Sequence, residues 1–309
     1  MQYTGELISI AVAVSWTVTA LFIEQASRQI GSLVVNVIRM VFSFLLIGGL
    51  LFFTTGSFIP LLADGSTWFW MVLSGLVGFV FGDLCLFYSY TLITSRFSQL
   101  IMTLAPPFAA LSGWLILGET MRPIGIAGMV LTLGGIAVSI FNRPRNGEKL
   151  KLKLPLRGIL FALGGALGQG VGIVLSKKGM LHYEISAAGN EAVSEFIPFA
   201  ATQIRVITGF VGFGAIVLLS GRWPKLKEAF RNRKALSNTF WGSFFGPAVG
   251  VSLSLMAVLY TSAGVASTIM ATVPILILVP YRMLYKQRIT WPEVAGAFVS
   301  VCGVALFFL

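Results

Sequence analysis

Residues 99–106 read Gln-Leu-Ile-Met-Thr-Leu-Ala-Pro, and residues 267–274, 168 positions later, read Ser-Thr-Ile-Met-Ala-Thr-Val-Pro. At the same offset, glycines and other small residues coincide along the chain. A hydrophobic pattern of five segments in residues 6–141 thus returns in residues 157–309, which predicts a chain built from two related halves. The coinciding pairs are Ser74 with Gly242, Gly78 with Gly246, Gly82 with Gly250, Gly128 with Gly296 and Gly135 with Gly303.

The composition places this chain in a membrane. The mean hydropathy is +0.88, 56% of the residues are hydrophobic and 11% are charged, whereas an ordinary soluble domain has about 25% charged residues. The apolar stretches are continuous rather than alternating, which predicts helices and not a barrel. Most of them reach the roughly 17–25 residues that a crossing requires. The predicted spans are 6–24, 33–53, 68–90, 97–117, 123–141, 157–176, 200–219, 239–260, 265–284 and 292–308.

Each half contains five of these spans, and an odd number of spans forces two related halves into opposite orientations. The sequence therefore predicts an all-α integral membrane protein with ten transmembrane helices in two inverted five-helix repeats. The predicted repeats are residues 1–141 and 157–309, and residues 142–156 form a basic loop between them. This is the architecture of alternating-access transporters, whose substrate site lies between the halves near the membrane midplane.

The formal net charge of +11 is concentrated in clusters beside the spans. Such clusters follow the positive-inside rule and attract anionic lipid headgroups, and they argue against a nucleic-acid role. The connections 54–67 and 179–198 contain no Lys or Arg. This distribution predicts that both termini lie outside the cytoplasm. The basic residues are Arg143, Arg145, Lys149, Lys151, Lys153 and Arg157 after span 5, Arg222, Lys225, Lys227, Arg231, Arg233 and Lys234 after span 7, and Lys286 and Arg288 after span 9.

Charged residues inside the spans are the strongest candidates for function. Asp83 is expected to be the one acid well inside a span, where a carboxylate is a functional hypothesis by default. Its natural partner is Arg39, and the pair is a structural lock between spans 2 and 3, a site for the charge of a substrate, or a proton-coupling site. Arg205 takes the place of Arg39 in the second half, where Val251 replaces Asp83. Arg205 either faces a substrate carboxylate or phosphate, or snorkels to the outer interface.

Prolines and glycines mark corresponding places in the two halves. Pro106 and Pro107 interrupt span 4 and Pro274 interrupts span 9. Proline removes a backbone donor and frees a carbonyl, and matching breaks in both halves point to a central site; a kink without a role in binding is the alternative. The glycine ladders are expected to pack helices closely, or to act as sliding surfaces when the halves move. A third ladder is Gly164, Gly168 and Gly172.

Several further side chains are candidates for lining a partly wet cavity between the halves. Aromatic rings with a polar tip suit such a lining, and uncharged polar groups can orient a ligand, although each also suits an ordinary interhelical hydrogen bond. No cofactor or metal site is expected. The candidate substrate-binding residues are Trp16, Arg39, Asp83, Tyr88, Thr103, Pro106, Gln169, Gln203, Arg205, Ser252, Thr272 and Pro274.

Enzyme chemistry is disfavoured by what the sequence lacks. His182 is the single histidine and is expected to fall in a loop, so no histidine-based dyad or metal cluster can form. An intramembrane aspartyl protease would need a second acid beside Asp83, and no Gly-rich phosphate loop occurs, so ATP bound to this chain does not drive transport. Cys85 and Cys302 fall inside spans and are expected to be packing residues.

One more set of features occurs in order in the first half and again in the second. The first half holds Trp16, Arg39, the stretch 75–90, Ala105-Pro106 and Leu117-Gly118-Glu119, and the second holds Arg205, Val273-Pro274, Lys286-Gln287, Gly296 and Gly303. In these features the chain resembles the EamA-type family of the drug/metabolite transporter superfamily. The resemblance covers essentially the whole chain. It implies ten helices in two inverted repeats around a central cavity, and transport of small organic solutes.

The expected function is secondary transport of a small polar organic solute, an amino acid or a related metabolite, across the cytoplasmic membrane. Arg39 and Arg205 favour a solute with a carboxylate. The alternative is a proton-coupled exporter of drugs or cations. The four-helix multidrug members of the superfamily carry a glutamate in the middle of the first helix, where this chain reads Ala13–Thr17, so the metabolite carrier is favoured. The expected partners are the solute and membrane lipids, and a homodimer is left open.

Overall fold

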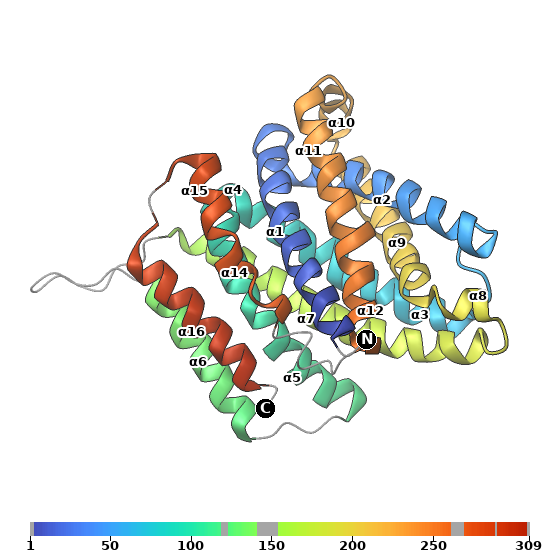
Figure 1. Ribbon diagram of the computed structural model, residues 1–309. Coiled ribbons are helices and arrows are strands. Elements are labelled where there is room, and N and C mark those ends of the chain that lie inside the picture. The colour runs from blue at the N-terminus through green and yellow to red at the C-terminus, as the bar shows by residue number, and fades with distance from the viewer. Residues whose placement is uncertain (1–2, 119–122, 141–153, 261–268, 288, 308–309) are drawn as a thin grey trace, which may run out of the picture.

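The computed structural model describes residues 3–118, 123–140, 154–260, 269–287 and 289–307. These residues form an all-helical bundle (Figure 1). Most of the predicted loop 142–156, with its basic cluster, lies outside them, as does Arg288. The elements of the first half are α1 (Thr4–Ile30), α2 (Ser32–Thr55), α3 (Gly65–Ser74), η1 (Gly75–Asp83), α4 (Leu84–Ile101), η2 (Met102–Leu104), α5 (Ala105–Leu117) and α6 (Pro123–Ile140). Those of the second half are α7 (Leu156–Ser186), α8 (Glu191–Ser194), α9 (Ile197–Leu219), α10 (Trp223–Ala229), α11 (Arg233–Ser243), η3 (Phe244–Val251), α12 (Ser252–Tyr260), α14 (Val273–Leu276), α15 (Leu278–Tyr285) and α16 (Trp291–Phe307).

The helices give the ten spans that the sequence predicts. Six continuous helical segments of the described chain are long and apolar enough to cross a membrane, and three shorter apolar helices accompany them. One of the six, residues 65–117, is 53 residues long, far more than the roughly 20 residues of one crossing. It turns back at Thr94, whose φ of 72° and ψ of 159° are not helical. Counting it as two spans gives ten.

The opposite orientation of the halves is visible in α6 and α16, which pack side by side (Figure 1). Thr132 donates a hydrogen bond to the Ser300 carbonyl at 3.4 Å, and Ser300 donates one to the Thr132 carbonyl at 3.3 Å. The two residues are equivalents at the 168-residue offset, so the pair lies on the pseudo-twofold axis. Gly135 meets Ser300 while Gly303 meets Thr132. The two equivalent helices are therefore antiparallel.

A stretch of π-helix occurs at the same place in each half and was not predicted from the sequence. η1 lies inside span 3 and η3 inside span 8. Such π-helical turns are rare in proteins, and those that do occur are often found at functional sites. Pro247 lies inside η3, and hydroxyl groups bond carbonyls of this stretch: Ser15 donates to the Phe245 carbonyl at 2.6 Å and Ser252 to the Pro247 carbonyl at 3.3 Å. These bonds satisfy backbone groups that the membrane cannot solvate.

The glycine ladders are packing surfaces. Gly78 and Gly82 of η1 lie against Gly172 and Gly168 of α7, and Ser74 bonds Ser176 at 2.7 Å in the same contact. The equivalent ladder of the second half packs on α1, where Gly242, Gly246 and Gly250 meet Ile23, Thr19 and Trp16. Small side chains thus let α7, the first helix of the second half, approach span 3 of the first half. In the same way they let α1, the first helix of the first half, approach span 8 of the second half. The packing interpretation is confirmed.

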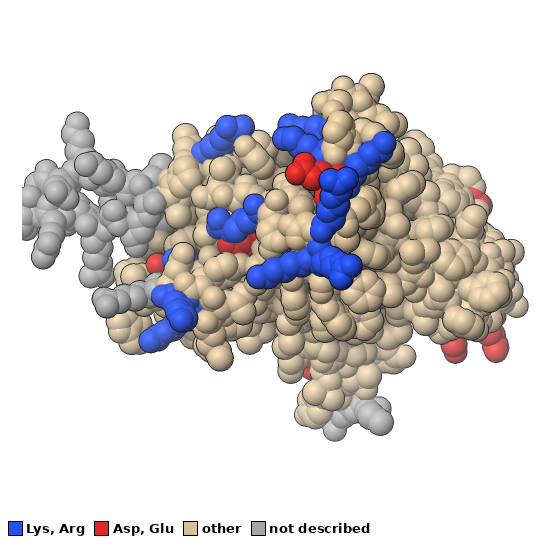
Figure 2. All heavy atoms as spheres, turned by 90° about the horizontal axis from the view of Figure 1, so that it is seen from above, with Lys and Arg blue, Asp and Glu red and all other residues tan. Residues whose placement is uncertain are grey.

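Basic side chains gather at one end of the bundle. Figure 2 views this end from above and shows Lys and Arg across the face. The short helix α10 contributes to it, and Lys225 and Lys227 are exposed there while Leu226 is buried. The start of α1 and the end of α16 lie toward the opposite side of the bundle (Figure 1).

Candidate functional site

Four predicted site residues converge in the interior, and they come from both halves. Arg39 of α2 forms an ion pair with Asp83 at the end of η1, as the sequence predicts. Gln169 of α7 donates a hydrogen bond to the other oxygen of the Asp83 carboxylate at 2.7 Å. Arg205 of α9 lies beside them and interacts electrostatically with Asp83 and Arg39. We call Arg39, Asp83, Gln169 and Arg205 the central cluster.

The repeat explains why two arginines meet here. Arg39 and Arg205 occupy equivalent places in α2 and α9, which pack against each other with Met40 on Gly209. Both guanidinium groups lie over the ring of Phe79, with Cζ at 5.5 Å from the centroid for Arg39 and 4.4 Å for Arg205. Arg39 also lies 4.7 Å from the centroid of Phe87. Contacts of this kind stabilise desolvated cations by about 2 kcal/mol or more.

The central cluster carries one arginine more than it has acids. Arg205 is 3% exposed, so it does not snorkel to the interface, which was one of the two alternatives. Among the described residues Arg28 pairs with Glu24 at 2.9 Å and Arg96 with Glu293 at 3.1 Å, but no acid pairs with Arg205. Leaving a buried charge without its partner costs about 3–5 kcal/mol, so this arrangement requires an explanation.

A second polar layer surrounds Glu24, near the basic end of the bundle. The expectation that Asp83 is the one acid inside a span is wrong, because α1 continues to Ile30 and buries Glu24 completely. Its carboxylate accepts hydrogen bonds from the N–H and hydroxyl of Ser95 and from Tyr281, the last at 3.4 Å. Glu24 thereby ties span 1 to the turn between spans 3 and 4 and to span 9. The signal in the sequence was Arg28, four residues after Glu24, because such a pair shares one helix face.

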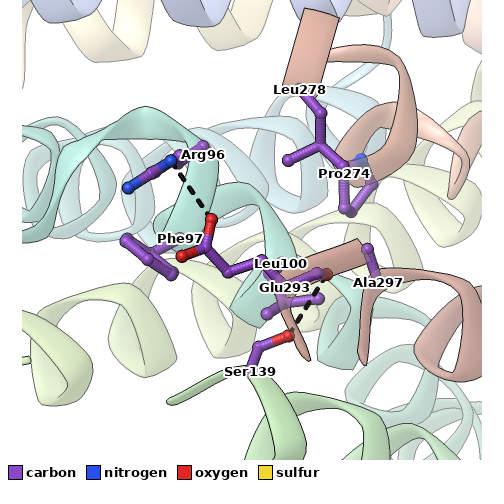
Figure 3. Close-up of a pocket in the computed structure, with 8 residues that line it drawn as sticks. All are labelled: Arg96, Phe97, Leu100, Ser139, Pro274, Leu278, Glu293 and Ala297. Atoms are coloured by element: carbon purple, nitrogen blue, oxygen red, sulfur yellow. Dashed lines mark hydrogen bonds and ion pairs between the residues drawn. The ribbon is translucent and has the colours of Figure 1, made fainter. Parts of the chain in front are cut away.

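The same layer continues to the ion pair of Arg96 and Glu293. Figure 3 shows this pair among the residues that line a narrow pocket of about 10 Å³, which has room for roughly one water molecule. Pro274 and Ser139 also line the pocket, and Ser139 donates a hydrogen bond to the Glu293 carbonyl at 3.4 Å. Spans 4, 5, 9 and 10 therefore meet here. The sequence analysis missed this pair because both residues fall at predicted span ends, where charges are ordinary.

Spans 4 and 9 are interrupted as predicted, and each proline lies where a new helix begins. Pro106 lies in the first turn of α5, directly after the tight turn η2, and Pro274 lies in the first turn of α14. Proline is tolerated at this position because the N–H it removes has no helical partner. Pro274 is one of the residues that line the pocket of Figure 3.

The remaining predicted site residues make structural contacts outside the central cluster. Thr103, Ser252 and Thr272 donate their hydroxyl hydrogen bonds to nearby carbonyls of their own segments. Gln203 bonds the carbonyls of Phe44 and Phe58 at 3.2 and 3.3 Å.

Two aromatic candidates pack away from the cluster. Trp16 packs on Gly250, and Tyr88 stacks edge-on against Phe161 with Arg157 above its ring. Among the polar candidates other than Gln169, Gln203 bonds another helix, whereas Thr103, Ser252 and Thr272 bond their own segments.

The central cluster is closed in this conformation. Arg39 and Asp83 are each 4% exposed, and Phe79 and Phe87 cover the guanidinium group of Arg39. A solute can therefore reach these groups only after the helices around them separate. Within the described ranges no group of three His, Cys, Asp or Glu residues is placed to hold a metal ion.

Comparison with known proteins agrees with this architecture. The sequence pattern of the EamA-like transporter family matches residues 3–141 and again residues 156–309. An uncharacterized transporter of Archaeoglobus fulgidus is 28% identical over 111 residues, which span only 37% of that protein and 35% of this chain. A solved structure described as "Crystal structure of protein" shares the fold: it aligns over 99% of this chain and 96% of its own with a TM-score of 0.62 and 16% identity.

Proposed function

The chain belongs to the EamA-like transporter family, a family of transporters and not of enzymes, and we propose that it is a secondary carrier of a small polar organic solute. The solute is an amino acid or a related metabolite, and it crosses the cytoplasmic membrane. One observation carries this proposal above the others: Arg205 is buried between the two halves, and no acid among the described residues pairs with it. A solute carboxylate is the partner that this guanidinium group accepts best.

The origin of the four residues of the central cluster supports alternating access. Arg39 and Asp83 belong to the first half, and Gln169 and Arg205 to the second. Rocking of one half against the other therefore separates the groups that meet in the closed state. Such motion around a fixed site at the repeat interface is the usual mechanism of inverted-repeat carriers.

The layer around Glu24 and the Arg96–Glu293 pair forms the barrier toward the cytoplasm in this proposal. Glu24 lies toward the end of α1, at the side of the bundle where Figure 1 places α10, and the positive-inside rule assigns that side to the cytoplasm. Both chain termini then lie outside. The same face attracts anionic lipid headgroups.

Export of cationic drugs by proton exchange fits the cluster less well. A cation would join two arginines and meet only one carboxylate, and both oxygens of Asp83 already accept hydrogen bonds from Arg39 and Gln169. Proton coupling of an anionic or zwitterionic solute through Asp83 is compatible with this geometry, and it is tested separately below.

Purified protein in a thermal-shift screen tests the proposal. A ligand that binds only the folded state raises the unfolding temperature by mass action. The panel consists of amino acids, organic acids, nucleosides and lipophilic cations, and each hit is then measured as flux into proteoliposomes with and without a pH gradient. Flux of polar metabolites supports the proposal. Flux confined to lipophilic cations contradicts it.

A further inference from the structure

We propose that the solute is a net organic anion, a monocarboxylate without an ammonium group, bound between Arg205 and Arg39. This inference rests on the proposed carrier function and names the class of substrate more narrowly. It follows from three features of the central cluster: its net charge, the hydrogen-bond donors that it leaves unused, and the acceptors that it has already used.

The charge of the cluster is the first feature. Arg39 and Arg205 are cations and Asp83 is an anion, and Arg205 interacts electrostatically with both of the others. The buried cluster thus has an excess charge of +1. A monoanion brings it to zero, a zwitterion leaves it at +1, and a cation raises it to +2. Burial in a medium of low dielectric penalises the last two states.

The unused donors are the second feature. Nε of Arg39 and Nε of Arg205 are buried and have no hydrogen-bond partner within the described ranges. Nε and one Nη of a guanidinium group form a fork that fits both oxygens of a carboxylate. Both guanidinium groups lie over the ring of Phe79, so an anion that enters here meets arginine donors beside an apolar ring.

The used acceptors are the third feature, and they separate an anion from an amino acid. An ammonium group needs a carboxylate or carbonyl oxygen to accept its hydrogen bonds. One oxygen of Asp83 accepts from Arg39 and the other from Gln169. Each oxygen of a carboxylate can accept a second hydrogen bond, so an ammonium group would have to share Asp83 with Arg39 and Gln169, whereas a carboxylate meets the unused Nε donors of the two arginines.

Matched ligand series on several carbon skeletons test the proposal by thermal shift of the whole purified chain. Each series holds the carboxylate, its neutral amide, the corresponding α-amino acid and the cationic α-amino amide. For at least one skeleton the carboxylate should bind at least about tenfold more tightly than the other three, because it alone gains charge-assisted hydrogen bonds without adding a positive charge. Equal or tighter binding of the α-amino acid in every series that binds overturns the inference and leaves the carrier function standing.

Variants connect this preference to Arg205. Arg205→Gln should bind carboxylate and amide equally, Arg205→Lys should retain part of the preference, and the exposed Arg282→Gln serves as the control for loss of one positive charge. An unchanged preference in Arg205→Gln overturns the inference. If this variant does not fold, as judged by gel filtration, the wild-type series and Arg205→Lys decide the outcome. A wild-type protein that binds no member of any series overturns this inference, whereas the wider panel of amino acids, organic acids, nucleosides and lipophilic cations decides the carrier function.

Discussion

Nη2 of Arg205 lies 2.7 Å from the point that a Cβ atom on Gly78 would occupy. The glycine thus leaves the space into which the arginine head fits, and the ladder that packs η1 on α7 also shapes the central cluster. A methyl group at position 78 must displace Arg205, because the neighbouring Gly172 Cα and Gly168 carbonyl of α7 lie 3.6 and 3.7 Å away.

Gly78→Ala should therefore lower solute transport severalfold while the protein still folds. Overpacking of this kind costs about 1–3 kcal/mol, which shows as a modest fall in unfolding temperature. Gly49→Ala in α2 is the matched control, because a Cβ there meets nothing within 4 Å. Transport by Gly78→Ala at the rate of Gly49→Ala would show that Arg205 need not occupy its present position.

Arg39 and Asp83 should be energetically coupled. Asp83→Asn leaves the Arg39 charge without its partner, and breaking a buried pair costs about 3–5 kcal/mol. The double variant Arg39→Gln/Asp83→Asn should recover much of that loss. A double-mutant cycle on the unfolding temperature measures the coupling; strictly additive effects would mean that the pair does not stabilise the fold. If solute flux depends on a pH gradient and Asp83→Asn loses that dependence, Asp83 is the coupling site.

Removing the Glu24 carboxylate should open the inner barrier. Glu24→Ala deprives Ser95, Arg28 and Tyr281 of a common acceptor, so spans 1, 4 and 9 lose the group that joins them. A cysteine placed at the buried Ser98, in a Cys85→Ala/Cys302→Ala background, should then react severalfold faster with a thiol reagent applied from the basic end. The same cysteine with Glu24 intact is the reference. Equal labelling rates would remove Glu24 from the barrier.

The basic end of the bundle should face the cytoplasm. A cysteine at Glu228 in α10 should resist an impermeant thiol reagent in intact cells and react after permeabilisation, whereas a cysteine at Tyr3 should react in both. The reverse labelling pattern would invert the topology and place the Glu24 layer on the outside.

The repeat made most of the fold predictable, because equivalent glycines mark equivalent helix contacts. The 168-residue offset that links Gly135 to Gly303 also locates the antiparallel contact of α6 and α16. The π-helical stretches η1 and η3 escaped the sequence analysis, since a π-turn leaves the apolar pattern of a span almost unchanged. The extension of α1 to Ile30 was not predicted either. Glu24 and Arg28 are charged and therefore indicated the end of the apolar span, whereas in the structure they pair with each other inside the helix.

All four members of the central cluster were among the predicted residues, but only the charged three stood out from the other candidates. Arg39, Asp83 and Arg205 are conspicuous in apolar spans, and a charge at that depth needs a partner. Hydroxyl and amide groups gave no comparable signal: Thr103 and Gln203 bond carbonyls nearby, as most such groups in membrane helices do, whereas Gln169 reaches Asp83. The sequence shows which helix carries each side chain, but it does not show whether that side of the helix faces the interior of the bundle.

Solute counterflow in proteoliposomes tests the central claim most directly. Vesicles with purified protein are loaded with an unlabelled organic acid that binds in the thermal-shift series, and are then diluted into a trace of the labelled acid. The proposed carrier should accumulate label transiently above its equilibrium level, and Arg205→Gln should lose this overshoot while Arg282→Gln keeps it. An overshoot in Arg205→Gln equal to that of the wild type, or one seen with lipophilic cations alone, would contradict the account.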